Sequence, residues 1–156
     1  MSSDVARVTV AVEVPPDAAF RIFTEEIDQW WLRGLRYRAL GGARSLVYLE
    51  PRQGGRLFEQ LGEQVVQTGE VTVWEPPSRL CFIWRGANLR APDQTQVEVL
   101  FTARGEGTLV TLTHSGWNRI PSDHPVRHGQ DDRAFLRRLG LWWGELLSSL
   151  RERAQL

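Results

Sequence analysis

A histidine and a glutamate are the polar residues whose positions could support chemistry. His114 continues the alternating pattern of Val110 and Leu112, so its imidazole is expected on the buried face at the end of a strand. There it could act as an acid or a base near neutral pH. Alternatively, it is a structural histidine that hydrogen-bonds to the backbone and holds the following turn. The sequence leaves both interpretations open.

Glu59 shares the parity of Leu57 and faces inward if that leucine does. A carboxylate in such a place is costly unless it is paired, and glutamate is rarely buried alone. Glu59 could accept a hydrogen bond from a ligand hydroxyl, or it could form a salt bridge with Arg56 or Arg85 at the rim. Together with His114 it would provide the two positioned polar groups that a chemical step needs.

A second group of polar residues has the composition of a metal site but not its pattern. His124 and His128, near Asp123, Asp131 and Asp132, give a His-x₃-His spacing without a second pair of ligands. We interpret this proline-containing segment as a solvated loop, with a lid over one end of a cavity as the alternative. No phosphate-binding glycine motif and no nucleophile elbow is present, so we predict neither a metal nor a cofactor.

Composition excludes several classes of partner. Basic and acidic residues each number 19, so no net charge would steer a polyanion, and we expect no nucleic acid. No apolar run approaches the ~20 residues that cross a bilayer, and the N-terminus lacks the order of a secretory signal. We therefore predict a cytoplasmic protein. Cys81 is the only cysteine, which excludes an intrachain disulfide and a cysteine-rich metal site.

Hydropathy patterns predict the elements that must position these residues. Alternation predicts a strand over residues 7–14, which ends at Pro15 and Pro16 because proline cannot donate to a ladder. Helical spacing follows over residues 17–26, and a short second helix through residues 30–32 stops near Gly34. Six more strands are predicted, over residues 45–50, 56–61, 67–74, 79–85, 94–103 and 108–115.

The last element is a long amphipathic helix that Asp131 or Asp132 can cap. A seven-stranded antiparallel sheet cannot cover its own inner face, so this helix must lie across it. The sequence therefore predicts an α+β fold in one domain over residues 1–156. The apolar stripe of the helix contains Phe135, Leu136, Leu139, Trp142, Trp143, Leu146, Leu147 and Leu150.

Several segments, in this order, resemble the START-like (SRPBCC) superfamily, in the branch of the activator of heat-shock-protein-90 ATPase (the Aha1-like C-terminal domain). They are residues 14–17 with Phe20 and the Trp30-Trp31 pair, residues 51–59, 69–84 and 113–117, and the Gly140-Leu141-Trp142-Trp143-Gly144-Glu145 run. The resemblance implies a helix-grip fold. In that fold a seven-stranded antiparallel sheet wraps around a long C-terminal helix, and two short helices follow the first strand.

The resemblance also suggests a function. Members of the superfamily bind lipids, sterols, polyketides or plant hormones between the sheet and the last helix. Some are cyclases or dehydratases, so an enzyme of that type that uses His114 and Glu59 is the alternative interpretation. We therefore expect a small hydrophobic or aromatic molecule as the partner, bound in a cavity with few polar groups. The chaperone activators carry an additional domain, whereas here the first strand begins by residue 5. A chaperone partner is accordingly doubtful.

A third interpretation is a protein-interaction module, either co-chaperone-like or a homodimer. An exposed apolar patch would mark it, and Leu141, Cys81, Ile83 and Leu100 are apolar on nominally outer faces. For the leading interpretation, parity and the resemblance predict a cavity lined by Trp30, Trp31, Leu57, Glu59, Val71, Val73, Phe82, Trp84, Val99, Phe101, Leu112, His114, Trp117, Leu139, Trp143 and Leu146.

Overall fold

A curved antiparallel sheet of seven strands is the framework of the molecule. The computed structural model describes residues 5–41, 44–86, 89, 92–121, 123–127 and 129–155. The strands lie in the order β1-β7-β6-β5-β4-β3-β2. Their bounds are Ala6–Val12 (β1), Leu46–Leu49 (β2), Arg56–Leu61 (β3), Gln64–Glu75 (β4), Arg79–Trp84 (β5), Thr95–Arg104 (β6) and Gly107–Ser115 (β7).

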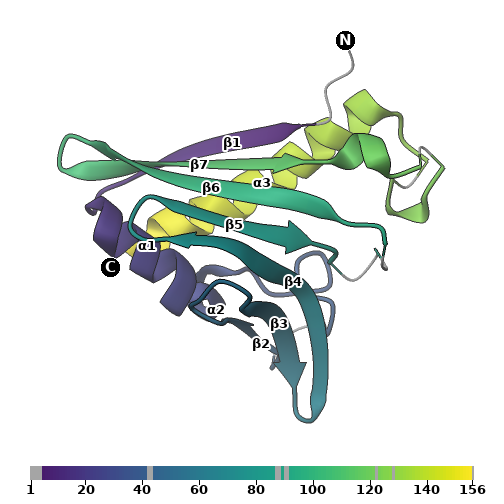
Figure 1. Cartoon of the computed structure of the whole chain (residues 1–156), viewed down its shortest axis with the longest axis horizontal. Coiled ribbons are helices and arrows are strands. Elements are labelled where there is room, and N and C mark those ends of the chain that lie inside the picture. Colours follow the sequence, from purple (N-terminus) through teal and green to yellow (C-terminus); the bar gives the residue numbers. More distant parts are fainter. Residues whose placement is uncertain are drawn as a thin grey trace.

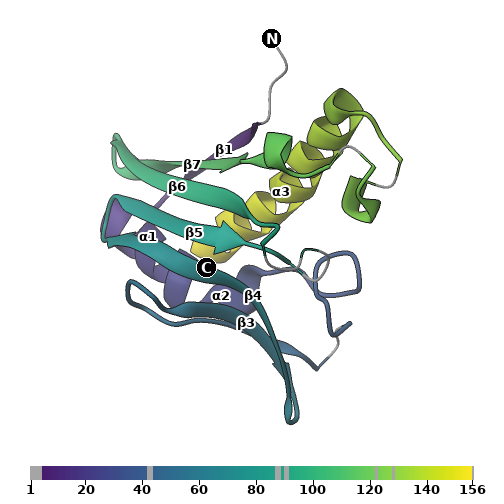
Figure 2. The same cartoon turned by 45° about the vertical axis from the view of Figure 1, so that its right-hand side comes forward.

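The helix α3 (Asp132–Ala154) lies across the concave face of this sheet (Figure 1 and Figure 2). Its N-terminus is capped as the sequence predicts, since the Asp131 carboxylate accepts a hydrogen bond of 2.8 Å from the Ala134 amide. The predicted antiparallel sheet, the long last helix and the α+β helix-grip class are thereby confirmed.

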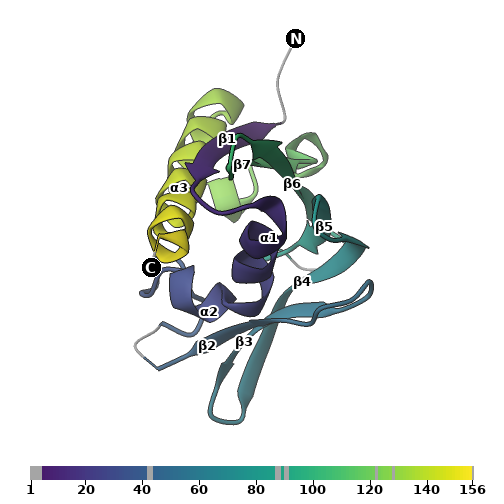
Figure 3. The ribbon, with the colours of Figure 1, turned by 90° about the vertical axis from the view of Figure 1, so that its left-hand side faces the viewer.

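Two short helices, α1 (Pro16–Glu25) and α2 (Ile27–Trp30), close one end of the space between sheet and helix (Figure 3). The second lies earlier than predicted: it ends at Trp30, the first residue of the predicted range, because Trp31 already has extended backbone. Four aromatic rings fill this closed end: Phe23 lies 4.8 Å from Trp30 and 5.8 Å from Phe101, and Phe20 lies 5.1 Å from Phe101. Their direct contacts make this end part of the packed core.

At the other end, the described residues form no covering α-helix. Parts of two irregular connections lie there. Residues 31–41 and 44–45 belong to the first. Residues 116–121, 123–127 and 129–130 belong to the second, which contains the 3₁₀ turns η1 (Trp117–Arg119) and η2 (Pro125–Arg127). Around the second segment a small apolar cluster contains Leu89, Trp117, Ile120 and Phe135. Three members of this cluster, Leu89, Trp117 and Phe135, border a cavity at this end.

A β-bulge in β4 changes which side chains face inward. Val71 pairs with Phe82, but Val73 pairs with Cys81, so Thr72 is an extra residue between the two pairs. Beyond the bulge Val73 therefore shares the outer face with Cys81, and Trp74, opposite Leu80, packs on the core instead. The prediction that Val73 faces inward was wrong, because alternation assumes an unbroken ladder.

Strand β4 also begins three residues before its predicted start. Gly62, with a φ of +60°, lies in a tight turn, and the ladder between β3 and β4 starts at Leu61 and Gln64. Residues 64 and 65 are exposed, so no apolar alternation marked this part of the strand. No helix in the described part of the chain is long and apolar enough to span a membrane.

Candidate ligand-binding site

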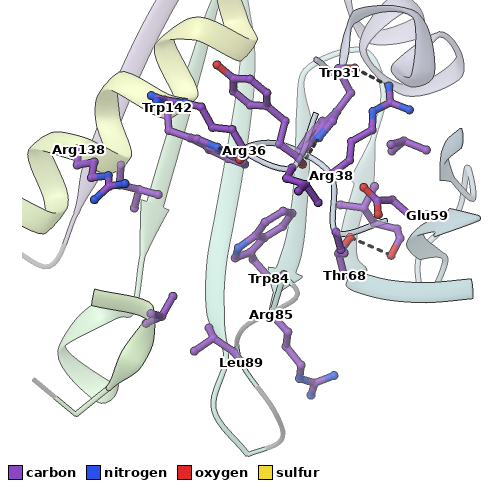
Figure 4. Close-up of a pocket in the computed structure, with 18 of the residues that line it drawn as sticks. Trp31, Arg36, Arg38, Glu59, Thr68, Trp84, Arg85, Leu89, Arg138 and Trp142 are labelled. Carbon is purple, nitrogen blue, oxygen red and sulfur yellow. Dashed lines mark hydrogen bonds between the residues drawn. The ribbon is translucent and has the colours of Figure 1, made fainter. Parts of the chain in front are cut away.

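A cavity of about 700 Å³ lies at the open end, between the N-terminal half of α3, residues 35–39, and the ends of β3 and β5 (Figure 4). Its volume is within the range of small-molecule sites. Aromatic and aliphatic side chains dominate its wall, and a few arginines and one carboxylate interrupt them. The apolar members of the wall include Trp31, Trp84, Trp117, Trp142, Val47, Leu57, Leu89, Val126, Phe135 and Leu139.

The predicted cavity residues divide into two groups. Six of the sixteen line the cavity: Trp31, Leu57, Glu59, Trp84, Trp117 and Leu139. The other ten are not in its wall, and apart from Val73 they are buried at the closed end or beneath α3, as ordinary core. These ten are Trp30, Val71, Val73, Phe82, Val99, Phe101, Leu112, His114, Trp143 and Leu146.

Two pairs of adjacent tryptophans mark the border between core and cavity. Trp30 is in the core, and its indole N–H donates to the Phe23 carbonyl, whereas Trp31 faces the cavity. On α3, Trp143 is fully buried, whereas Trp142 lines the cavity one residue away, as the ~100° step of a helix requires. The rings of Trp31 and Trp143 lie 5.7 Å apart at 89°, so the two sides of the border are in contact.

His114 is on the core side of this border, with no exposed surface. The indole N–H of Trp143 donates to its Nδ1 at 3.0 Å, because an indole nitrogen has no acceptor capacity. The ring proton is therefore on Nε2, which lies 2.7 Å from the Thr95 hydroxyl. Burial lowers the pKa of His114 to about 3. The residue is thus a neutral structural histidine, held by two side chains rather than by the backbone.

Glu59 is in the cavity wall and is 3% exposed. Neither predicted salt bridge forms. Arg56 instead donates to the Glu50 carboxylate, which lowers the pKa of Glu50 to about 2, and Arg85 donates to Gln94. The hydrogen bond of Glu59 is with the Leu40 amide, at 2.8 Å. Among the described residues it has no cationic partner.

Buried arginines hold both irregular segments in place. All five donors of Arg38 are used: its guanidinium pairs with Asp28 at 2.8 Å and also bonds the backbone carbonyls of Asp28, Trp31, Leu32 and Ser45. Arg127 does the same for the other segment, since it pairs with Asp132 at 2.6 Å and bonds the carbonyls of Trp117, Ile120 and Pro121. The loops beside the cavity are therefore fixed by polar contacts.

A surface latch connects residues 36 and 37 to α3 above the cavity. The Glu145 carboxylate accepts from Arg36 and from the Tyr37 hydroxyl, both at 2.6 Å, and the Trp142 indole donates to the Arg36 carbonyl at 2.7 Å. The Tyr37 hydrogen bond, and then the Arg36 charge, hold the pKa of Glu145 below its ordinary value. Tyr37 also stacks on Trp142, with ring centres 6.0 Å apart.

Several donors at the cavity have no acceptor within the described chain. The Trp117 indole nitrogen and the Arg85 Nε are buried and unpaired. Neither the Trp84 indole nitrogen nor the Arg138 guanidinium makes a hydrogen bond or ion pair with any described residue, and both residues line the cavity. An unpaired buried donor costs about 1–3 kcal/mol, and this cost applies to Trp117 and Arg85. Arg138 is exposed to solvent and adds a positive charge to the wall. The wall therefore favours a molecule that supplies acceptors.

The histidine-rich segment forms a local turn. His124 Nδ1 accepts from the Val126 amide at 3.0 Å, and its Nε2 lies 3.9 Å from Asp93. His128 lies outside the described residues. Among the residues that are described, no three His, Cys, Asp or Glu side chains are grouped as metal ligands.

The sequence patterns did not identify the polar residues that shape the cavity, namely Asp28, Arg36, Tyr37, Arg38, Thr68, Arg127, Arg138 and Glu145. Most of them lie in connections between elements or on the polar side of α3, where neither periodicity nor a motif marks them. The ion pair between Asp28 and Arg38 joins residues ten positions apart. Regular helix or strand spacing does not predict a contact at that separation.

Comparisons with known proteins agree with this architecture. The family model described as Activator of Hsp90 ATPase homolog 1-like protein matches residues 13–152. Protein MLL2253 from Mesorhizobium loti is similar in structure, with a TM-score of 0.64, 19% identity, and coverage of 95% of this chain and 94% of that one. No curated protein matches the sequence.

Two further solved structures are similar in fold. The Aha1 dimer from Colwellia psychrerythraea has a TM-score of 0.65 at 14% identity, over 97% of this chain and 96% of that chain. PFC0360w, an HSP90 activator from Plasmodium falciparum, has a TM-score of 0.62 at 22% identity, over 90% and 88%. Likeness at these identities concerns the fold.

Proposed function

Since this chain belongs to the family of Activator of Hsp90 ATPase homolog 1-like proteins, we propose that it binds a small hydrophobic or aromatic molecule in the cavity beside Trp84. The observation that carries the proposal is the cavity itself. It has about 700 Å³ of space, and four tryptophans and Phe135 contribute to its wall, which is the lining that small apolar ligands prefer.

The arrangement favours binding over catalysis. A cyclase or dehydratase that uses His114 would need its imidazole to touch the bound molecule. Both ring nitrogens of His114 are occupied, the ring is fully buried, and the residue is not in the cavity wall. Glu59 alone remains beside the ligand, where it could accept a hydrogen bond from a hydroxyl.

Native mass spectrometry of freshly purified protein is the first test. We expect an extra mass that disappears on denaturation, and a saturable rise in fluorescence with the neutral probe N-phenyl-1-naphthylamine. The tryptophans in the wall supply a second signal, because a bound aromatic molecule alters their emission. The absence of both a native adduct and probe binding would contradict the proposal.

A matched pair of variants on α3 ties this binding to the cavity. Leu139 lines the cavity, whereas Leu141 is 65% exposed on the outer face. Leu139→Trp fills part of the space and is expected to weaken the probe about tenfold or more, the equivalent of at least ~1.4 kcal/mol. Leu141→Trp adds the same side chain outside and should leave probe affinity within about twofold. Equal effects of the two variants would mean that the probe binds elsewhere.

A second candidate function is self-association along β2. This strand ends the sheet, so one side of its backbone has no neighbouring strand. Leu46 and Tyr48 are each 40% exposed on it, while the predicted patch residues Cys81, Ile83 and Leu100 are less exposed and partly buried. Light scattering after size exclusion tests this: a dimer that Tyr48→Lys converts to monomer supports it, and a wild-type monomer at high concentration contradicts it.

A further inference from the structure

We infer that the molecule bound in the cavity is a lipophilic carboxylic acid, whose carboxylate meets Arg138 and Trp84. The inference rests on the proposed function, because it names the chemical class of the ligand for that same cavity. Three observations carry it: the unpaired donors in the wall, the excess of positive charge there, and the placement of the one acidic group.

The first observation is an imbalance between donors and acceptors. The indole nitrogens of Trp31 and Trp142 donate to carbonyls of the chain, but those of Trp84 and Trp117 have no acceptor among the described residues. The Thr68 hydroxyl is already engaged, since it donates to the Leu57 carbonyl. The free hydrogen-bonding capacity of these groups is therefore mostly that of donors, which a ligand can satisfy only with acceptor oxygens.

The second observation concerns charge. Four arginines and one glutamate line the cavity. Glu145 pairs with Arg36 and Asp28 pairs with Arg38, whereas Arg85 and Arg138 form no ion pair with any described residue. Two uncompensated cations thus remain against the single carboxylate of Glu59. In a chain with equal numbers of basic and acidic residues, this wall is locally cationic.

The third observation sets the orientation of the ligand. Figure 4 places Arg138, on α3, at one side of the cavity, Trp84 in the middle, and Glu59, on β3, at the other side. A carboxylate next to Glu59 would be repelled, while next to Arg138 it gains a charge-assisted hydrogen bond. The acidic group is therefore expected at the α3 side, with the apolar body directed toward Leu57 and Val47.

The test compares acids with alcohols of the same carbon skeleton. Decanoate is titrated against decan-1-ol, and 2-naphthoate against 2-naphthylmethanol, at pH 7.5 by isothermal titration calorimetry. We expect at least one acid to bind about tenfold more tightly than its alcohol, as a hydrogen bond to a charged group provides. The decanoate pair tests an aliphatic acid and the naphthoate pair tests an aromatic acid, so the two pairs distinguish these two kinds of ligand.

Neighbouring arginines on α3 supply the matched control. Arg138→Gln is expected to remove the preference for the acid while leaving the alcohol within about twofold, whereas Arg137→Gln, at an exposed position outside the cavity wall, should retain the preference. Glu59→Gln should strengthen acid binding, because it removes the one negative charge from the cavity wall. Circular dichroism of each variant checks that the fold is intact.

The outcomes separate this inference from the proposed function. If N-phenyl-1-naphthylamine binds but both alcohols bind as tightly as their acids, the proposal of a ligand-binding cavity is kept. The inference that the ligand is a carboxylic acid is then wrong. The same holds if Arg138→Gln weakens acid and alcohol alike, or if decylamine binds better than decanoate and loses that advantage in Glu59→Gln. If no probe binds at all, both proposals fall.

Discussion

The two halves of α3 cover very different spaces, although one apolar stripe runs along the whole helix. Under the C-terminal half, Leu146, Leu147 and Leu150 are buried with the aromatic rings of α1. Under the N-terminal half, Leu139 and Trp142 face a cavity. The difference lies in what closes each end: an amphipathic helix supplies apolar side chains, whereas irregular segments supply mainly backbone carbonyls that polar side chains must satisfy.

The two ends are therefore stabilised by different interactions. The closed end depends on buried apolar area, and its rings are in direct contact. The open end depends on Arg38 and Arg127, which together bond seven backbone carbonyls around the cavity. Such a wall keeps its shape without filling its interior, which is what a binding site requires.

The largest expected effect is a difference in the stability lost when a leucine is shortened in each half of α3. Leu146→Ala removes a fully buried side chain from a packed environment and should lower the free energy of unfolding by about 2–5 kcal/mol. Leu139→Ala shortens a side chain that borders the cavity, and it should lower the free energy of unfolding by about 1 kcal/mol or less. Urea denaturation of both variants measures this. Similar losses would mean that the N-terminal half is packed as tightly as the other.

The next effect concerns pH. The folded-state pKa of His114, about 3, lies below its ordinary value of 6.5 because the ring is buried. Its contribution to stability is then complete above pH 6.5 and is lost as the pH falls toward 3, since the unfolded chain binds the proton first. This residue alone should lower the free energy of unfolding by about 2 kcal/mol between pH 7 and pH 5.

Urea denaturation at both pH values, for wild type and His114→Gln, tests that expectation. The variant is less stable at pH 7, because glutamine cannot reproduce the bonds to Trp143 and Thr95. Its stability should nevertheless depend less on pH in this window. An unchanged dependence would mean that His114 is accessible to solvent protons in the folded state, which would reopen its role in chemistry.

The smallest expected effect is at the latch. Glu145→Gln weakens the contacts with Arg36 and Tyr37. Arg36 and Glu145 are largely exposed and Tyr37 is partly exposed, so the free energy of unfolding should change by less than about 1 kcal/mol. Amide hydrogen exchange of residues 34–41 should nevertheless become faster, because the latch holds that segment on α3. Unaltered exchange would show that Arg38 alone fixes the segment.

Residues 67–84 illustrate how far the sequence patterns reach. Alternation located the two strands and the inward places of Val71, Leu80 and Phe82, which are all buried. It failed at Val73, because one extra residue in the ladder reverses every later side chain and nothing in the local pattern marks the insertion. Predicting where the ladder slips requires the partner strand as well.

The arginines illustrate a different gap. All 19 basic residues of the chain are arginines, and the sequence treats them alike. In the folded protein Arg38 and Arg127 are almost fully buried, Arg36 is paired with Glu145, and Arg138, at the cavity, forms no ion pair with any described residue. The rigid five-donor fork of arginine suits all these roles, so residue type cannot distinguish them.

By itself, the sequence determined the order of the elements, the antiparallel sheet, the long capped helix and the apolar faces that meet between them. These follow from periodicity, turn residues and caps, which act over a few residues of chain. Only the tertiary structure decided which tryptophans are core and which face the cavity, and why His114 is inert. Those properties depend on how irregular segments, distant in sequence, satisfy their backbone groups around a space that no local pattern encodes.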